Sequence, residues 1–178
     1  MKNKILIVVD MQEDFITGTL GSAEAKEILP RVEKKVKEFE GEIIFTMDTH
    51  GENYPDTQEG KNLPVAHCLE NTPGWELAGS LDALCKKLGA RVYKKGTFGS
   101  LALVQELKKR EEEIVSIELI GVCTDICVVS NALLLKAYLP ELPISVDASC
   151  CAGVTPQKHT AALETMRSCQ IKVKHIED

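Results

Sequence analysis

Cys127 is the residue whose place in the chain most favours chemistry. It lies between the apolar run Ile114–Ile120, typical of a buried strand, and the Ala- and Leu-rich run Ser130–Tyr138, typical of a helix. This order places Cys127 in the first turn of a helix, just past the carboxyl end of a strand, where α/β sheets bind ligands. The field of a helix N-terminus lowers the pKa of a thiol. Two interpretations stay open: a cysteine nucleophile, or the buried and inert cysteine that free cysteines commonly are.

Three more reactive side chains follow other strand-like runs. Asp10, Asp48 and Lys95 each stand at the end of such a run. Each has an ordinary explanation on its own, because Asp after a strand commonly caps a loop and Lys there is commonly solvated. The carboxyl ends of parallel strands lie along one edge of a sheet, so these side chains and Cys127 are predicted to share one site. A carboxylate, an ammonium and a thiol together suit nucleophilic catalysis.

A metal site is predicted at the same edge. Asp48 and His50 are two residues apart and share a face of an extended chain, and His67 follows in a loop with several acids. Oxygen and imidazole ligands suit zinc, with manganese or iron as further candidates. The Asp-x-His spacing is a weak motif, and a histidine near a strand end without a ligand is the alternative. His159 and His175 are interpreted as structural or solvated.

Alternating strand and helix patterns position these residues. Strands are predicted at Ile5–Asp10, Glu42–Asp48, Arg91–Lys94, Ile114–Gly121, Ile144–Asp147 and Ile171–His175. Helices are predicted at Ala23–Phe39, Trp75–Leu88, Leu101–Glu112, Thr124–Tyr138 and Pro156–Ser168. Strands separated by helices indicate βαβ units and a parallel sheet. We expect an α/β fold with about six parallel strands and helices on both faces, in a single domain spanning residues 1–178.

Three local features bear on these elements. Thr155 followed by Pro156 is typical of a helix start, with Thr as N-cap and Pro in the first turn. Pro30 falls inside the first predicted helix and is expected to kink or split it. Residues 49–74 form a long irregular stretch rich in Gly, Asn, Pro and Asp. A loop of that length in a compact domain is usually functional or disordered.

The composition and charge of the chain limit the classes of partner that it can bind. The chain of 178 residues carries a net charge of −6, which disfavours nucleic acid and anionic membranes because both need clustered cations. A small-molecule ligand is favoured instead. No apolar run is long enough to span a membrane, and no signal peptide is visible. Seven cysteines without a secretory signal indicate free thiols in a reducing compartment, so we expect a cytoplasmic protein, and we expect a homo-oligomer.

Several segments resemble motifs of the isochorismatase-like cysteine hydrolases, and most closely those of the nicotinamidases. Asp10–Phe15 resembles the opening D-x-Q-x-D-F, Lys95–Phe98 resembles K-x-x-[YF], and Gly121–Val128 resembles G-V-x-T-D-x-C-V. Asp48–His50 and Pro64–Cys68 resemble the metal loop. The segments follow the family's order over nearly the whole chain, and the match at Gly121–Val128 is the specific one.

The resemblance implies a Rossmann-like fold and a catalytic triad of Asp10, Lys95 and Cys127. It also implies a cis peptide bond between Val122 and Cys123, and an oxyanion site built from the backbone N–H groups of Cys123 and Cys127. The implied reaction is hydrolysis of a small carboxamide, nicotinamide first, to nicotinate and ammonia through a thioester acyl-enzyme.

The metal loop departs from the family pattern. Family members usually carry a further His or Glu ligand between the first and last metal-site histidines. Glu59 is the best substitute in this chain, with Asp56 and Glu52 behind it. We therefore predict one divalent metal ion, zinc first, with these ligands: Asp48, His50, His67 and Glu59.

The substrate pocket departs from the pattern as well. The family's aromatic residue that stacks on the pyridine ring, three positions before the last metal-site histidine, is Pro64 in this chain. Phe15 and Phe98 are left to hold the ring beside Pro64. A proline cannot stack as an aromatic side chain does, so nicotinamide is expected to bind with a raised KM.

Other functions remain open on the same residues. One is hydrolysis of a different amide or a ureido substrate by the same triad. A vinyl-ether hydrolase of the isochorismatase type is less favoured, because such relatives do not need the nucleophilic cysteine. A non-catalytic ligand- or metal-binding domain would not require the triad, and a peroxide-sensing thiol would not require Asp10 and Lys95.

Overall fold

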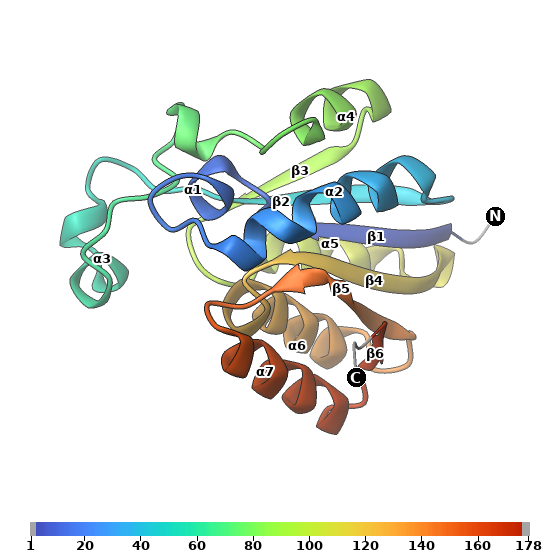
Figure 1. The fold of residues 1–178 in the computed structure, drawn as a ribbon. Coiled ribbons are helices and arrows are strands. Elements are labelled where there is room, and N and C mark those ends of the chain that lie inside the picture. The colour runs from blue at the N-terminus through green and yellow to red at the C-terminus, as the bar shows by residue number, and fades with distance from the viewer. Residues whose placement is uncertain (1–2, 176–178) are drawn as a thin grey trace.

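A parallel sheet forms the centre of the molecule. The computed structural model describes residues 3–175, and over that range the sheet has six strands in the order β3-β2-β1-β4-β5-β6 (Figure 1). The strands are β1 (Asn3–Val9), β2 (Glu42–Asp48), β3 (Arg91–Lys95), β4 (Ile114–Val122), β5 (Ile144–Ala152) and β6 (Lys172–Lys174). Every neighbouring pair is parallel, which confirms the predicted α/β fold.

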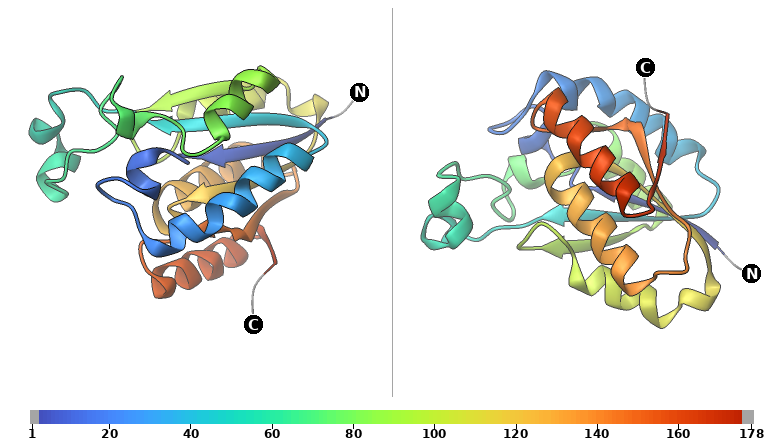
Figure 2. Two further views of the ribbon diagram at one scale, coloured as in Figure 1. Left: turned by 45° about the horizontal axis from the view of Figure 1, so that its top comes forward. Right: turned by 90° about the horizontal axis from the view of Figure 1, so that it is seen from below.

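Helices cover both faces of this sheet, as Figure 2 shows. In the described part of the chain they are α1 (Glu13–Ile16), α2 (Ala23–Glu38), α3 (Gln58–Asn62), α4 (Leu81–Leu88), α5 (Leu101–Lys109), α6 (Val129–Tyr138) and α7 (Pro156–Ser168). Apolar side chains of α1, α2 and α4 pack on one face, and those of α5, α6 and α7 pack on the other. Burial of this apolar surface on both sides of the sheet is the main force that assembles the layers.

One glycine lets the two central strands approach each other. Gly121 near the end of β4 has φ +115° and pairs with Val9 of β1. A Cβ at Gly121 would run into the backbone of Val9, so another residue would push β4 away from β1. Only glycine combines this conformation with this approach. The glycine that opens the segment 121–128 thus brings the chain after β4 next to the chain after β1.

Of the two features predicted for the helices, the N-cap at Thr155 is confirmed and the break at Pro30 is not. Thr155 accepts a hydrogen bond from the N–H of Lys158 at 3.2 Å, which confirms the predicted N-cap of α7. Pro30 lies inside α2, which runs unbroken from Ala23 to Glu38, so the expectation that Pro30 splits this helix is wrong. The buried apolar face of α2 holds the helix together although proline removes one hydrogen bond.

Several segments differ from the predicted boundaries. The strand predicted at Ile144–Asp147 continues to Ala152. The helix predicted from Trp75 begins only at Leu81, because Gly79 has φ +59° and interrupts the helical path. The stretch 49–74 is not wholly irregular, since it contains a 3₁₀ turn at Tyr54–Asp56 and the short helix α3. Among the described residues, none of the helices has the length and apolarity needed to cross a membrane.

Candidate active site

Three reactive side chains meet at the carboxyl edge of the sheet. The Lys95 ammonium lies 2.6 Å from Asp10 Oδ2 and 3.5 Å from Cys127 Sγ. All three residues are buried, with exposed fractions of 0% for Asp10 and 5% for both Lys95 and Cys127. The structure thus brings together the carboxylate, the ammonium and the thiol that the sequence predicted to share a site.

A different element supplies each of the three. Asp10 follows β1 with φ +47°, which turns the chain out of the sheet, and its Oδ1 accepts a hydrogen bond from Thr46 Oγ1 at 2.7 Å. Lys95 is the last residue of β3. Cys127 lies in a π-helical turn, Thr124–Val128, that joins β4 to α6. Such turns are rare and are frequent at functional sites.

Burial controls the protonation of these groups. It raises the pKa of Cys127 well above that of an ordinary thiol; the Asp10 carboxylate adds to the effect and the Lys95 ammonium opposes it. Burial also raises the pKa of Asp10, against the opposing charge of Lys95. Burial and the Asp10 charge thus act against the lowering of the Cys127 pKa that is expected at a helix N-terminus. A protonated thiol beside a more basic carboxylate suits proton transfer at the moment of attack.

Four possible metal ligands, called the metal group below, lie beside the triad. One ligand atom each of Asp48, His50, Glu59 and His67 lies within 4.8 Å of all the others. The Asp48 Oδ2 atom is 3.0 Å from His50 Nε2 and 3.4 Å from His67 Nε2. Glu59 Oε1 is 3.7 and 3.8 Å from the same two nitrogens. Two carboxylates and two imidazoles form a donor set that suits a divalent transition metal.

The orientation of His67 also fits a metal ligand. Its Nδ1 lies 2.8 Å from the carbonyl oxygen of Val65. A carbonyl only accepts, so Nδ1 carries a hydrogen, and in the neutral imidazole Nε2 then has the free lone pair. That lone pair faces Asp48 and Glu59. A metal-bound histidine commonly has its second nitrogen held in this way.

A cavity of about 450 Å³ borders both the triad and the metal group. Cys127 lines it together with three of the possible metal ligands, Asp48, Glu59 and His67. Its wall is mostly apolar. A small molecule in this cavity would therefore contact the thiol and the metal group together.

The expected ring-binding residues divide into two groups. Phe15 and Phe98 line the cavity, as predicted. Pro64 is exposed and is not among the residues described as lining this cavity. Its neighbour Leu63 lines the cavity instead.

The peptide bond between Val122 and Cys123 is cis, as the family resemblance implied. Cys123 is half-buried and lines the cavity beside Cys127. Burial raises the pKa of Cys123 to about 12. At neutral pH its thiol is therefore protonated.

Sequence analysis missed several polar residues that hold this site. Thr46 binds the Asp10 carboxylate, and the amides of Gln12 and Asn131 are completely buried. Asn131 Nδ2 donates to the carbonyl oxygen of Cys127 at 2.8 Å and to that of Phe98 at 3.1 Å. For Thr46 and Asn131 the only sequence signal is a polar side chain inside an apolar pattern, which does not reveal its partner. Gln12 is also the glutamine of the motif D-x-Q-x-D-F at Asp10–Phe15, which does not reveal its partner either.

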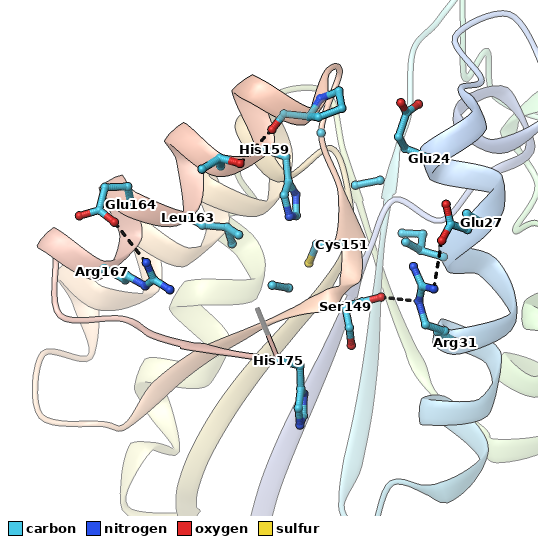
Figure 3. Close-up of a pocket in the computed structure, with 16 residues that line it drawn as sticks. Glu24, Glu27, Arg31, Ser149, Cys151, His159, Leu163, Glu164, Arg167 and His175 are labelled. Carbon is cyan, nitrogen blue, oxygen red and sulfur yellow. Dashed lines mark hydrogen bonds and ion pairs between the residues drawn. The ribbon is translucent and has the colours of Figure 1, made fainter. Parts of the chain in front are cut away.

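A second cavity, of about 350 Å³, lies between α2, β5 and α7 (Figure 3). Both arginines that line it are paired with a neighbouring glutamate: Arg31 lies 3.3 Å from Glu27, and Arg167 lies 3.3 Å from Glu164. Arg31 Nε also donates to the carbonyl oxygen of Ser149 at 2.7 Å. None of the three triad residues is among those described as lining it, so the first cavity is the better candidate for the active site.

Two histidines of the second cavity have structural contacts. His159 Nδ1 lies 2.7 Å from the Thr124 hydroxyl oxygen, and burial lowers its pKa. His175 Nδ1 lies 3.1 Å from Asp147 Oδ1, and its side chain is 64% exposed. These positions agree with the structural and solvated roles expected for the two residues.

Comparisons with known proteins agree with this geometry. Residues 4–178 match the model of the isochorismatase domain family. The chain is 32% identical over 171 residues to an uncharacterized isochorismatase family protein of Bacillus subtilis, covering 90% of this chain and 92% of that relative. It is 26% identical over 187 residues to the nicotinamidase/pyrazinamidase of Mycobacterium tuberculosis, covering 96% and 97%.

A solved structure shares the fold. The crystal structure of the pyrazinamidase of Pyrococcus horikoshii in complex with zinc is similar with a TM-score of 0.82 and 28% identity, covering 98% of this chain and 99% of that chain. The predicted family resemblance is confirmed, and the chain belongs to the isochorismatase domain family.

Proposed function

We propose that this protein is a cysteine amidase that hydrolyses a small carboxamide, with nicotinamide as the first candidate. The observation that carries the proposal is the meeting of Asp10, Lys95 and Cys127 beside a cavity that Cys127 lines together with three possible metal ligands, Asp48, Glu59 and His67. The names of similar proteins, a nicotinamidase/pyrazinamidase and a pyrazinamidase, support nicotinamide as the substrate. Asp10, Lys95 and Cys127 are proposed as the catalytic residues.

The first half of the reaction forms a thioester. Asp10 accepts the proton of the Cys127 thiol, and the sulfur attacks the amide carbonyl carbon. Lys95 keeps its positive charge, because the neighbouring carboxylates raise its pKa although burial acts to lower it. The N–H groups of Cys123 and Cys127 are proposed to stabilise the oxyanion, at about 2.7–4 kcal/mol per donor. Asp10 then gives its proton to the amide nitrogen, the C–N bond breaks and ammonia leaves.

The second half regenerates the enzyme. Water enters the place that ammonia left, and Asp10 removes one of its protons as the oxygen attacks the thioester carbon. The C–S bond breaks, the carboxylic acid forms, and Cys127 recovers its proton from Asp10. The same carboxylate thus acts alternately as base and acid, which its raised pKa favours.

Asp48, His50, His67 and Glu59 are proposed to hold a divalent metal ion, zinc first. The donor set and the orientation of His67 Nε2 fit such an ion. A bound metal would supply a Lewis-acidic position for a ring nitrogen of the substrate. Phe15, Phe98 and Leu63 would contact the ring itself.

The test is a screen for ammonia release by the purified protein. The substrates are nicotinamide, pyrazinamide, simple aliphatic amides and ureido acids, each with and without a chelator. We expect nicotinamide to have the highest kcat/KM and the chelator to lower it, with activity restored by zinc. Activity confined to aliphatic amides or ureido acids would reject nicotinamide but keep the cysteine amidase. No hydrolysis of any of them by the zinc-loaded protein would reject the amidase itself.

Three expectations stay predictions. The cytoplasmic location can be tested by fractionation of the cells that produce the protein, and the homo-oligomer by light scattering. The single domain spanning residues 1–178 predicts one cooperative unfolding transition.

A further inference from the structure

Gln12 is a buried residue that the proposed mechanism does not use. It is 0% exposed, and its side-chain amide makes three hydrogen bonds. Nε2 donates to the carbonyl oxygen of Asp48 at 2.9 Å and to that of Trp75 at 2.8 Å, while Oε1 accepts from the N–H of Asp48 at 2.7 Å. Both backbone polar groups of Asp48 are therefore bound by one side chain.

The sheet geometry explains why Asp48 needs this contact. β1 pairs with β2 up to Val9 and Thr46, after which β1 ends while β2 continues to Asp48. The edge of β2 that faces β1 then lacks a strand partner. A primary amide has the same donor and acceptor groups as a peptide bond, so Gln12 replaces the missing strand at Asp48.

Asp48 is the residue at which the two parts of the site meet. Its Oδ2 faces His50 Nε2 at 3.0 Å and His67 Nε2 at 3.4 Å. Its Oδ1 lies 3.4 Å from Lys95 Nζ. A rotation of the Asp48 backbone would move the carboxylate away from both groups at once. The three hydrogen bonds of Gln12 restrict that rotation.

We infer that Gln12 is a positioning residue, whose amide clamps the backbone of Asp48 so that the carboxylate is held ready for the metal ion. The inference rests on the proposed metal site, because Gln12 would act on the metal ion only through the backbone of Asp48. Loss of the clamp should weaken metal binding more than it weakens the fold.

Asn131 provides a matched control on the other side of the site. It is also a completely buried amide, and it too makes three hydrogen bonds, since its Oδ1 accepts from Ser100 N–H at 2.9 Å in addition to its two donations to Cys127 and Phe98. None of these partners belongs to the metal group. A variant at Asn131 therefore removes the same kind of contact without releasing Asp48.

The experiment measures zinc affinity of the full-length, metal-free protein by competition with a chromophoric chelator, together with thermal unfolding. Gln12→Met keeps the side-chain length and removes all three hydrogen bonds. Gln12→Asn withdraws the amide by one methylene and leaves space for water to bind the freed groups, so it serves if the first variant does not fold. Asn131→Leu is the control.

We expect both Gln12 variants to bind zinc about 10–100-fold more weakly than the wild type, as is usual when a supporting contact of a ligand is lost. Asn131→Leu should lower the unfolding temperature by a similar amount and keep the wild-type zinc affinity. Wild-type zinc affinity in a folded Gln12 variant would overturn the inference while leaving the metal site intact. An equal loss in Asn131→Leu would also overturn it, since a general loss of stability would then explain both. A wild-type protein that binds no zinc would overturn the proposed metal site first, and this inference with it.

Discussion

Cys127 and Asp10 are both buried beside Lys95, and this environment governs how they exchange a proton. In water a carboxylate is a weak base toward a thiol, because the ordinary pKa of Asp is far below that of Cys. Burial raises the pKa of both groups. The Lys95 ammonium lies 2.6 Å from Asp10, and its positive charge stabilises the one negative charge that Asp10 or Cys127 carries. The reactive pair is thus a property of three buried residues and not of the cysteine alone.

Replacement of the nucleophile tests this arrangement most directly. Cys127→Ala should lower kcat by about 10⁴-fold or more, the order found when a covalent nucleophile is removed. Cys123→Ala should keep most of the activity, because only the backbone N–H of Cys123 is proposed to act. Steady-state ammonia release measures both. Mass spectrometry of a trapped acyl-enzyme should find the adduct on Cys127, and an adduct on any other cysteine would disprove the mechanism.

Asp10→Asn tests the proton transfer. Asn is similar in shape and cannot accept the thiol proton, so kcat should fall by about 10²–10⁴-fold with a smaller change in KM. Lys94→Ala is the control, because Lys94 is exposed and pairs with Glu70 at the surface; its effect should be slight. Near-normal kcat in Asp10→Asn would exclude Asp10 as the proton carrier.

The cavity wall predicts a change in substrate affinity. Leu63 lines the cavity while Pro64 does not, so Leu63→Phe should lower the KM for nicotinamide by about 2–10-fold, as one added aromatic contact allows. Pro64→Phe should leave KM unchanged, because that side chain would point to solvent. The reverse result would show that the loop after α3 turns its other side to the substrate.

At the scale of the elements, the site is assembled from parts of unequal rigidity. Asp10, Asp48 and Lys95 stand at the ends of neighbouring strands, which the sheet holds in register. Glu59 stands on α3, a helix of five residues that is too short to be stable by itself. Of the four possible metal ligands, only Asp48 therefore lies in a strand of the sheet, and the other three lie in the stretch of residues 49–74.

This difference predicts graded metal binding. Glu59→Gln should reduce zinc affinity by about 10-fold, and His50→Ala should reduce it further, because Glu59 is partly exposed and lies farthest from the other ligands. Elemental analysis of purified protein should find about one zinc per wild-type chain and none in His50→Ala. Full zinc content in His50→Ala would contradict the proposed ligand set.

In the molecule as a whole, the proposed catalytic groups lie at one edge of the sheet and the ion pair between Arg110 and Glu42 lies at the opposite edge. The reactive groups lie at the carboxyl ends of the strands. At the other end, the Arg110 guanidinium binds Glu42 at the start of β2 through two hydrogen bonds of 2.6 and 2.7 Å. These bonds hold the pKa of Glu42 below its ordinary value of 4.5, although burial acts to raise it.

That pair predicts how stability depends on pH. A carboxyl whose pKa is lower in the folded protein stabilises the fold above its unfolded pKa, and this contribution is lost as the pH falls through the folded value. Glu42→Gln should therefore lower the free energy of unfolding at pH 7 by about 1–3 kcal/mol and flatten the loss of stability below pH 4.5. Urea unfolding at several pH values measures both effects. Because Glu42 is far from the catalytic edge, kcat at neutral pH should not change, and a change would show coupling between the two edges.

Three features could be predicted from the residues alone: the alternation of strands and helices, the family motifs, and the strand ends that carry Asp10, Asp48, Lys95 and Cys127. These features are local, because the spacing of apolar residues that is typical of a strand or a helix can be read within a short segment of the chain. A parallel sheet then brings distant strand ends to one edge by its topology alone. That is why most of the candidate site could be predicted without coordinates.

The remaining features depend on how the elements pack against one another. The raised pKa of Cys127 depends on the water removed by other elements, and no local pattern records that. The choice of Leu63 over Pro64 depends on which side of a loop faces the cavity. The contact between Gln12 and Asp48 joins residues 36 positions apart, and it arises because β1 ends before β2. Burial, loop direction and long-range hydrogen bonds are set by how the elements pack, so a single sequence leaves them undetermined.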